Sequence, residues 1–124
     1  MLNLDTHILI NALAGDLTAE ESRLLRSHRW SISAIVFWEI AKLAQLGRIE
    51  MALDDPSVIR ALGSVHVWPL TIEVARASTQ LDIRSDPADE LIAATSVVHK
   101  APLLTRDRVL RRSRMIPLAR RGVV

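Results

Sequence analysis

The chain contains no cysteine, which excludes disulfide bonds, zinc–thiolate sites and thiol catalysis together. The absence of cysteine fits a reducing compartment, and we expect the protein to be cytoplasmic. Glycine is scarce as well: the four glycines are spread along the chain, and none lies in a glycine-rich phosphate-binding loop. Aromatic residues make up only 3% of the sequence, so the predicted core is aliphatic.

Long apolar runs are missing too. No stretch approaches the roughly 20 apolar residues that span a bilayer, and no basic segment with a cleavage site opens the sequence. We therefore expect a soluble protein that is neither exported nor bound to a membrane. Hydrophobic residues nevertheless make up 49% of the 124 residues, which is enough for one folded domain over 1–124.

Short segments of two kinds alternate along the chain. Strand-like segments are predicted at 2–5, 30–34, 65–70, 101–105 and 115–118. Segments with helical spacing and capping residues lie between them, at 7–14, 19–28, 36–46, 56–63, 72–81, 87–99 and 106–113. This alternation predicts an α/β protein, a three-layer α/β/α sandwich around a central, mainly parallel sheet.

Acidic residues recur where the functional site of such a fold is expected. Asp5 ends the first predicted strand, and Asp107 lies just beyond the fourth. Glu39, Asp86 and Asp89 lie in the first turns of predicted helices. Because the carboxyl ends of parallel strands and the starts of the following helices share one edge of the sheet, we expect these five carboxylates to converge.

Helix capping is an alternative explanation for three of these acids. Asp86 precedes a proline as an N-cap residue would, and Asp107 can cap the last short helix. Asp89, at the third helical position, favours the helix dipole. Asp5 caps no long helix in the predicted pattern, and Glu39 lies in an apolar stretch, so neither is explained in this way. Exposure to solvent explains the acids at other helix ends and turns, which are Glu20, Glu21, Glu50, Asp54 and Glu73.

A cluster of carboxylates requires protons or a cation. Two carboxylates about 4 Å apart repel each other by roughly 4 kcal/mol at an effective dielectric constant near 20. A set of oxygen ligands without cysteine or paired histidines favours Mg²⁺ or Mn²⁺ over zinc. These ions hold phosphate oxygens and lower the pKa of a bound water, so the expected chemistry is hydrolysis of phosphodiester bonds.

Arginine supplies 14 of the 16 basic residues, and seven of the arginines lie between Arg106 and Arg121. The planar guanidinium group matches the oxygens of phosphate. We therefore predict contacts to nucleic acid from four of these residues, Arg106, Arg108, Arg111 and Arg112. A solvated basic surface is the alternative interpretation of the same run.

Three stretches together resemble a known family: "LNLDTHILINAL", "SAIVFWEIAKLAQLGRI" and "DPADELIAATSVVHKAPLLTRDRVL". Their order and spacing are similar to those of PIN-domain ribonucleases, specifically the VapC-type toxins of bacterial toxin–antitoxin pairs. The resemblance runs from Met1 to near Pro117. It implies a PIN-like fold and a Mg²⁺- or Mn²⁺-dependent endoribonuclease that acts as the toxin of such a pair.

The resemblance also implies roles for individual residues. The catalytic, metal-binding acids are expected to be Asp5, Glu39, Asp89 and Asp107. Asp86 is a companion acid, and Thr105 is placed to orient a ligand or a water. Where the family usually has a basic residue after the acid of the third stretch, this chain has Glu90, so no substrate contact is carried over to that position. The expected partners are an RNA substrate, a second copy of the chain and a cognate antitoxin whose tail covers the acidic cleft.

Two other functions remain open at this point. A receiver-like signalling domain also holds Mg²⁺ in an acidic pocket, but it requires a lysine at the end of a late strand, and neither Lys42 nor Lys100 follows such a strand. A catalytically inactive module that binds nucleic acid or an antitoxin would keep the same fold and the same acids. Among the other residues, His7 is predicted to make local hydrogen bonds. Core packing is predicted for the three tryptophans, Trp30, Trp38 and Trp68, and stacking on a base or burial in a dimer face is the alternative for Trp38.

Overall fold

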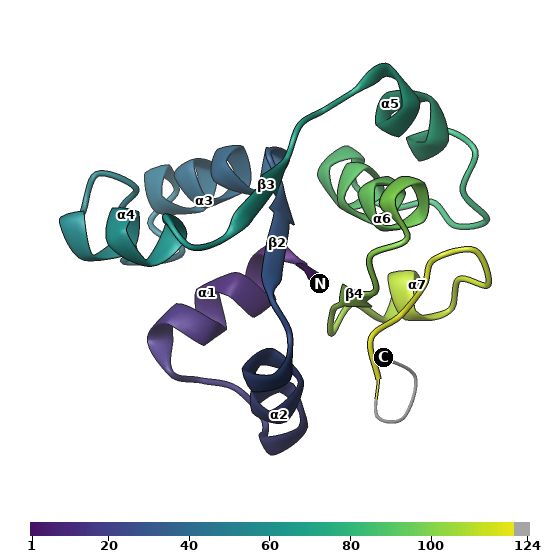
Figure 1. The fold of residues 1–124 in the computed structure, drawn as a ribbon. Coiled ribbons are helices and arrows are strands. Elements are labelled where there is room, and N and C mark those ends of the chain that lie inside the picture. The colour runs from purple at the N-terminus through teal and green to yellow at the C-terminus, as the bar shows by residue number, and fades with distance from the viewer. Residues whose placement is uncertain (121–124) are drawn as a thin grey trace.

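The computed structural model describes residues 1–120 and contains one parallel sheet of four strands in the order β3-β2-β1-β4 (Figure 1). The strands are β1 (Leu2–Leu4), β2 (Trp30–Ser33), β3 (His66–Trp68) and β4 (Leu103–Leu104). The helices are α1 (Thr6–Ala14), α2 (Ala19–Ser27), α3 (Ile35–Gln45), α4 (Pro56–Leu62), α5 (Ile72–Ser78), α6 (Pro87–His99) and α7 (Arg108–Arg111). In residues 1–120 no helix has the length and apolar character needed to cross a membrane.

Helices cover both faces of this sheet. Figure 1 shows α1, α3 and α4 on one side of the strands and α5 and α6 on the other. The side chains between the layers are aliphatic, and the largest fully buried ones include Leu2, Leu4, Ile8, Ile32 and Ile92. Both the three-layer parallel architecture and the aliphatic core that the sequence predicts are confirmed. Strands covered on both faces need apolar residues at successive positions, which explains their leucine- and isoleucine-rich sequences.

The order in which strands are added to the sheet reverses at β1: β2 and β3 lie on one side of it and β4 on the other. Strand β1 pairs with β2 on one side and with β4 on the other, and β3 lies beyond β2. The backbone N–H of Asp5 donates to the carbonyl of Leu104 at 3.1 Å, so the ends of β1 and β4 are held side by side. In open parallel sheets the site lies at such a switch point, outside the carboxyl ends of the strands.

A buried asparagine links the first strand to the longest helix. Asn3 is fully buried, and its Nδ2 donates to the carbonyl of Ile92 at 3.1 Å and to Ser96 Oγ at 2.9 Å. These bonds fix α6 against β1. The first turn of α6, which carries Asp89, is thereby held at the same edge of the sheet as Asp5.

The fifth predicted strand, at 115–118, does not form. Leu118 makes a single parallel bridge to Leu103. The N–H groups of Met115 and Ile116 bond to Ser113 Oγ, both at 3.0 Å, and Pro117 has no N–H to donate. At positions 115–117 the backbone amides that would pair with a neighbouring strand are therefore bonded to Ser113 or, at the proline, absent.

Of the three tryptophans, Trp30 packs against the hydrophobic core. Trp38 is 54% exposed, so the prediction of core packing is wrong for this residue. The buried face of α3 carries Val36 and Ile40, and a position midway between two residues four apart lies on the opposite side of a helix. Trp68 is partly buried and lies outside the core cluster of residues 1–120, where it stacks on His99 with ring centroids 4.0 Å apart.

Candidate metal centre

Three carboxylates from separate parts of the chain meet at the switch point. Asp5 follows β1, Glu39 lies in α3 and Asp89 lies in the first turn of α6. One oxygen from each lies within 4.8 Å of the others. The convergence expected from the sequence is therefore present for these three residues. Their separation is suited to three oxygens around one cation.

Each of these carboxylates accepts a hydrogen bond from one hydroxyl group. The pairs are Thr105 Oγ1 with Asp5 Oδ2 at 2.5 Å, Thr6 Oγ1 with Glu39 Oε1, and Ser85 Oγ with Asp89 Oδ2 at 3.0 Å. A carboxylate oxygen has two lone pairs, so each group keeps acceptor capacity for a cation. The hydroxyls fix the direction in which the remaining lone pairs point.

Asp5 is also a helix cap, although the predicted pattern offers no long helix for it to cap. It is the N-cap of α1, and its Oδ1 accepts from the Thr6 N–H at 2.8 Å. Only 6% of Asp5 is exposed. This carboxylate is consequently held at both oxygens, by a backbone amide on one side and by the Thr105 hydroxyl on the other.

Burial raises the pKa of all three carboxyl groups. The pKa of Asp5 is raised mainly by loss of solvent, and the pKa of Glu39 by loss of solvent and then by the charge of Asp5. Burial followed by the charge of Asp5 raises the pKa of Asp89 from 3.8 to about 6. A cluster of this kind favours a bound cation, because a cation offsets both the desolvation and the mutual repulsion.

The other two predicted acids lie in the same cavity, which has a volume of about 610 Å³. Asp107 lines it, and its Oδ1 also caps α7 by accepting from Val109 N at 2.8 Å and Leu110 N at 3.1 Å. Asp86 occupies the N-cap position of α6, but its side chain makes no capping hydrogen bond. The capping explanation is therefore right for Asp107 and wrong for the side chain of Asp86. The cavity is lined by Asp5, His7, Asn11, Glu39, Leu43, Arg48, Asp86, Asp89, Arg106 and Asp107.

Sequence reasoning missed several residues of this cavity. Thr6 and Ser85 were not predicted, although each lies next to or near an acid that was. His7, for which local hydrogen bonding was predicted, lines the cavity, and its charge lowers the pKa of both Asp5 and Glu39. The sequence did offer a signal for Thr6, because it carries a hydroxyl directly after Asp5 and metal-binding carboxylates are commonly oriented by a neighbouring hydrogen-bond donor.

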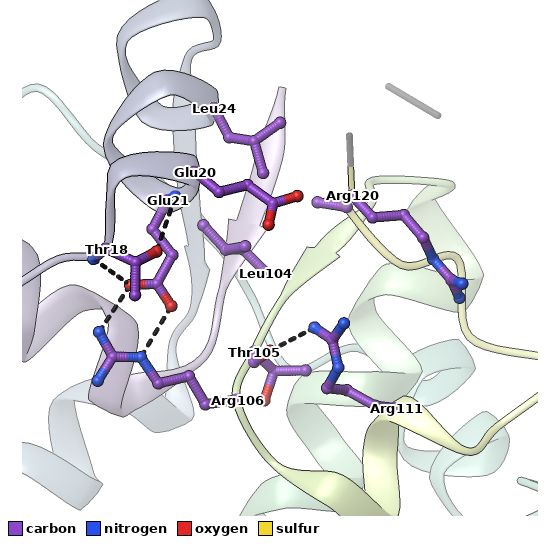
Figure 2. Close-up of a pocket in the computed structure, with 10 residues that line it drawn as sticks. Thr18, Glu20, Glu21, Leu24, Leu104, Thr105, Arg106, Arg111 and Arg120 are labelled. Carbon is purple, nitrogen blue, oxygen red and sulfur yellow. Dashed lines mark hydrogen bonds and ion pairs between the residues drawn. The ribbon is translucent and has the colours of Figure 1, made fainter. Parts of the chain in front are cut away.

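Arg106 is paired with an acid that was expected to be solvated. Glu21 is only 8% exposed, and its Oε2 and Oε1 accept from Arg106 Nε at 2.8 Å and Nη2 at 2.6 Å (Figure 2). The Arg106 guanidinium lowers the pKa of Glu21. The solvent explanation for Glu21 is therefore wrong. Arg108, Arg111 and Arg112 are all exposed, and of these three Arg111 lines a second cavity described below.

The fold and the site together define a parallel α/β protein with an acidic centre suited to a divalent cation. The chain belongs to the PIN-domain family, because the model of the PIN domain matches residues 3–114. It is 38% identical over 88 residues to Ribonuclease VapC22 of Mycobacterium tuberculosis, a match that covers 68% of this chain and 67% of that protein.

Solved structures show the same fold. VapBC2 from Rickettsia felis, bound to a DNA fragment from its promoter, matches with a TM-score of 0.71 and 18% identity over 96% of this chain and 98% of that chain. A toxin–antitoxin complex from Klebsiella pneumoniae matches with a TM-score of 0.65 and 21% identity over 86% of this chain and 87% of that chain.

Proposed function

We propose that the protein is a Mg²⁺- or Mn²⁺-dependent endoribonuclease that acts as the toxin of a cytoplasmic toxin–antitoxin pair. The observation that carries this proposal is the meeting of Asp5, Glu39 and Asp89 within 4.8 Å at the switch point of the sheet. The similarity to a protein named as a ribonuclease supports RNA as the substrate. The similarity of the fold to a toxin–antitoxin complex and to VapBC2 supports a cognate antitoxin as a partner.

The donor set fits these ions because it consists of carboxylate oxygens alone. Asp5, Glu39 and Asp89 would hold the ion, with Asp107 contributing from the wall of the same cavity. When bound, such an ion polarises the scissile phosphate and generates a hydroxide-like nucleophile from water. Asp86, in the same cavity, adds negative charge that favours the cation.

The residues of the chain perform the remaining tasks. The hydroxyls of Thr6, Ser85 and Thr105 orient the three carboxylates. We further propose that two copies of the chain associate and that the tail of the antitoxin covers the acidic cleft.

Cleavage assays with the purified wild-type protein test the proposal. We expect single-stranded RNA to be cut in Mg²⁺, to stay intact when EDTA removes the metal, and to be cut again when excess Mg²⁺ or Mn²⁺ is restored. The readout is the length of end-labelled fragments on a denaturing gel. Intact RNA under every divalent ion, together with retained RNA or antitoxin binding, would instead identify an inactive binding module on the same fold.

Replacing Thr105 with valine tests whether its hydroxyl positions Asp5. Valine keeps the shape of threonine but removes both the donor to Asp5 Oδ2 and the acceptor for the Asp107 N–H. We expect metal affinity to fall by about 10- to 100-fold, as is typical when an outer-shell partner is lost. Isothermal titration with Mn²⁺ measures this affinity directly. Thr105→Ser retains the hydroxyl and should recover most of it, and a failure to recover would assign Thr105 to packing alone.

A further inference from the structure

A second cavity, of about 300 Å³, lies beside the acidic one at the end of β4. Three arginines line it, Arg106, Arg111 and Arg120, and we call it the arginine cavity. Leu24, Leu104 and Ala119 form its apolar lining. Figure 2 shows α2 along one side of this space and the segment that follows β4 along the other.

The two cavities meet at one ion pair. Arg106 lines both of them, and its guanidinium is held by both oxygens of Glu21 and by the carbonyl of Asp16 at 3.1 Å. Its charge is thus compensated by Glu21, and its position is fixed. Arg106 therefore separates the two cavities, and we expect Arg111 and Arg120 to be the residues that bind an anion.

Arg111 keeps its charge available in the arginine cavity. Its Nη1 donates to the carbonyl of Thr105 at 3.1 Å, which orients the guanidinium without neutralising it (Figure 2). Arg120 lies across the cavity from α2, and its side chain is exposed. Glu20 also lines the cavity, so the lining carries three positive and two negative side chains, the second acid being Glu21.

We infer that the arginine cavity binds a phosphate group of the RNA strand that flanks the scissile phosphate. This inference rests on the proposed function. Every nucleotide of a strand carries a phosphate, and a strand that enters the acidic cavity must place its next phosphates outside a cluster that repels them. The space adjoining the cluster at Thr105 and Arg106 is the one where Arg111 and Arg120 present guanidinium groups. Apolar neighbours strengthen the attraction between guanidinium and phosphate.

The structure separates two arginines that the sequence groups together, and this supplies a matched pair of variants. Both side chains are exposed, but Arg111 lines the arginine cavity and donates to the carbonyl of Thr105, whereas Arg112 lines neither cavity. We expect Arg111→Gln to weaken RNA binding by about tenfold and to reduce the slope of log affinity against log salt by about 0.7, the value for one phosphate contact on a single strand. Arg112→Gln should leave both quantities close to those of the wild type.

The measurement is fluorescence anisotropy with a fluorescein-labelled, eight-nucleotide single-stranded RNA in EDTA at several salt concentrations. Binding without metal separates this site from catalysis, so a protein that fails to cleave RNA can still show or lack the site. Two further variants do not alter the hydrogen bond to Thr105: Arg120→Gln should weaken binding, and Glu20→Gln should strengthen it. Circular dichroism and thermal melting confirm that each variant is folded.

An unchanged affinity and salt slope in both Arg111→Gln and Arg120→Gln would overturn the inference. Equal losses in Arg111→Gln and Arg112→Gln would also overturn it, because they would indicate a diffuse basic surface. If the two cavity variants bind RNA normally but bind the cognate antitoxin more weakly, the cavity belongs to the protein partner and the inference is wrong.

Discussion

Replacing Asp5 with asparagine is expected to lower RNA cleavage by more than about a hundredfold, since a lost outer-shell partner alone costs up to about that factor. Asp5 belongs to the three-carboxylate cluster and is the most buried member of it. Asparagine has the same shape, and its amide oxygen can still accept from the Thr6 N–H, so the cap of α1 is retained. What the substitution removes is the negative charge that a cation requires.

Stability should respond in the opposite direction to activity. Burial raises the pKa of Asp5, which means that the charged form is disfavoured in the folded protein. Without metal, Asp5→Asn should therefore melt at the same temperature as the wild type or higher. Asp54→Asn removes the same charge from an exposed position outside the cavity and is the matched control, with wild-type cleavage expected. Cleavage by Asp5→Asn at the rate of the wild type would show that the centre is not built around Asp5.

Much of the fold could be predicted because local patterns carry it. The alternation of strands and helices fixes a parallel sheet, and the carboxyl ends of parallel strands must share an edge. Asp5 and Asp107, which follow neighbouring strands, could therefore be placed together from the sequence alone. Capping patterns located α2 and α6 for the same reason: Thr18 and Glu21 form a capping box, and Pro87 opens the helix that carries Asp89.

The parts that were missed depend on contacts distant in sequence. Glu21 satisfies a local capping pattern, yet the same carboxylate pairs with Arg106, 85 residues away. The sequence of a capping box is the same whether or not an arginine pairs with its glutamate, so the pairing of Glu21 with Arg106 could not be predicted from the local sequence. The bond from Thr105 to Asp5 spans 100 residues as well, and the role of Thr105 was predicted only through the resemblance to the family. The absent strand at 115–118 is also a matter of competition, because the side chain of Ser113 holds amides that a ladder would need.

Acidification is expected to stabilise the metal-free protein and to weaken its hold on metal. The pKa of Asp89 is about 6 in the folded protein, against an ordinary value of 3.8 for this group in an unfolded chain. Between these values the folded state binds more protons than the unfolded state, so stability falls as pH rises. This contribution is fully present below the unfolded pKa and is lost as pH rises through about 6. The raised pKa values of Asp5 and Glu39 act in the same direction.

Metal reverses this dependence because protons and Mg²⁺ compete for the same oxygens. With Mg²⁺ at ten times its dissociation constant at pH 7.5, we expect the melting temperature to rise by about 5 °C. Protonation of Asp89 alone should lower the apparent metal affinity by about tenfold between pH 7.5 and pH 5. Differential scanning calorimetry of metal-stripped protein, with and without Mg²⁺, measures both effects.

The difference between the melting temperatures with and without Mg²⁺ reports on the three-carboxylate centre alone. The exposed acids and the histidines outside the cavity contribute equally to both temperatures. Asp89→Asn cannot titrate at this position and should lose the part of the pH dependence of that difference that comes from Asp89. A metal-induced shift that is as large at pH 5 as at pH 7.5 would contradict the assignment, since the ion would then be held by groups that remain charged throughout that range. A shift that disappears in Asp89→Asn but persists in Asp54→Asn would place the bound ion at the three carboxylates that the fold brings together.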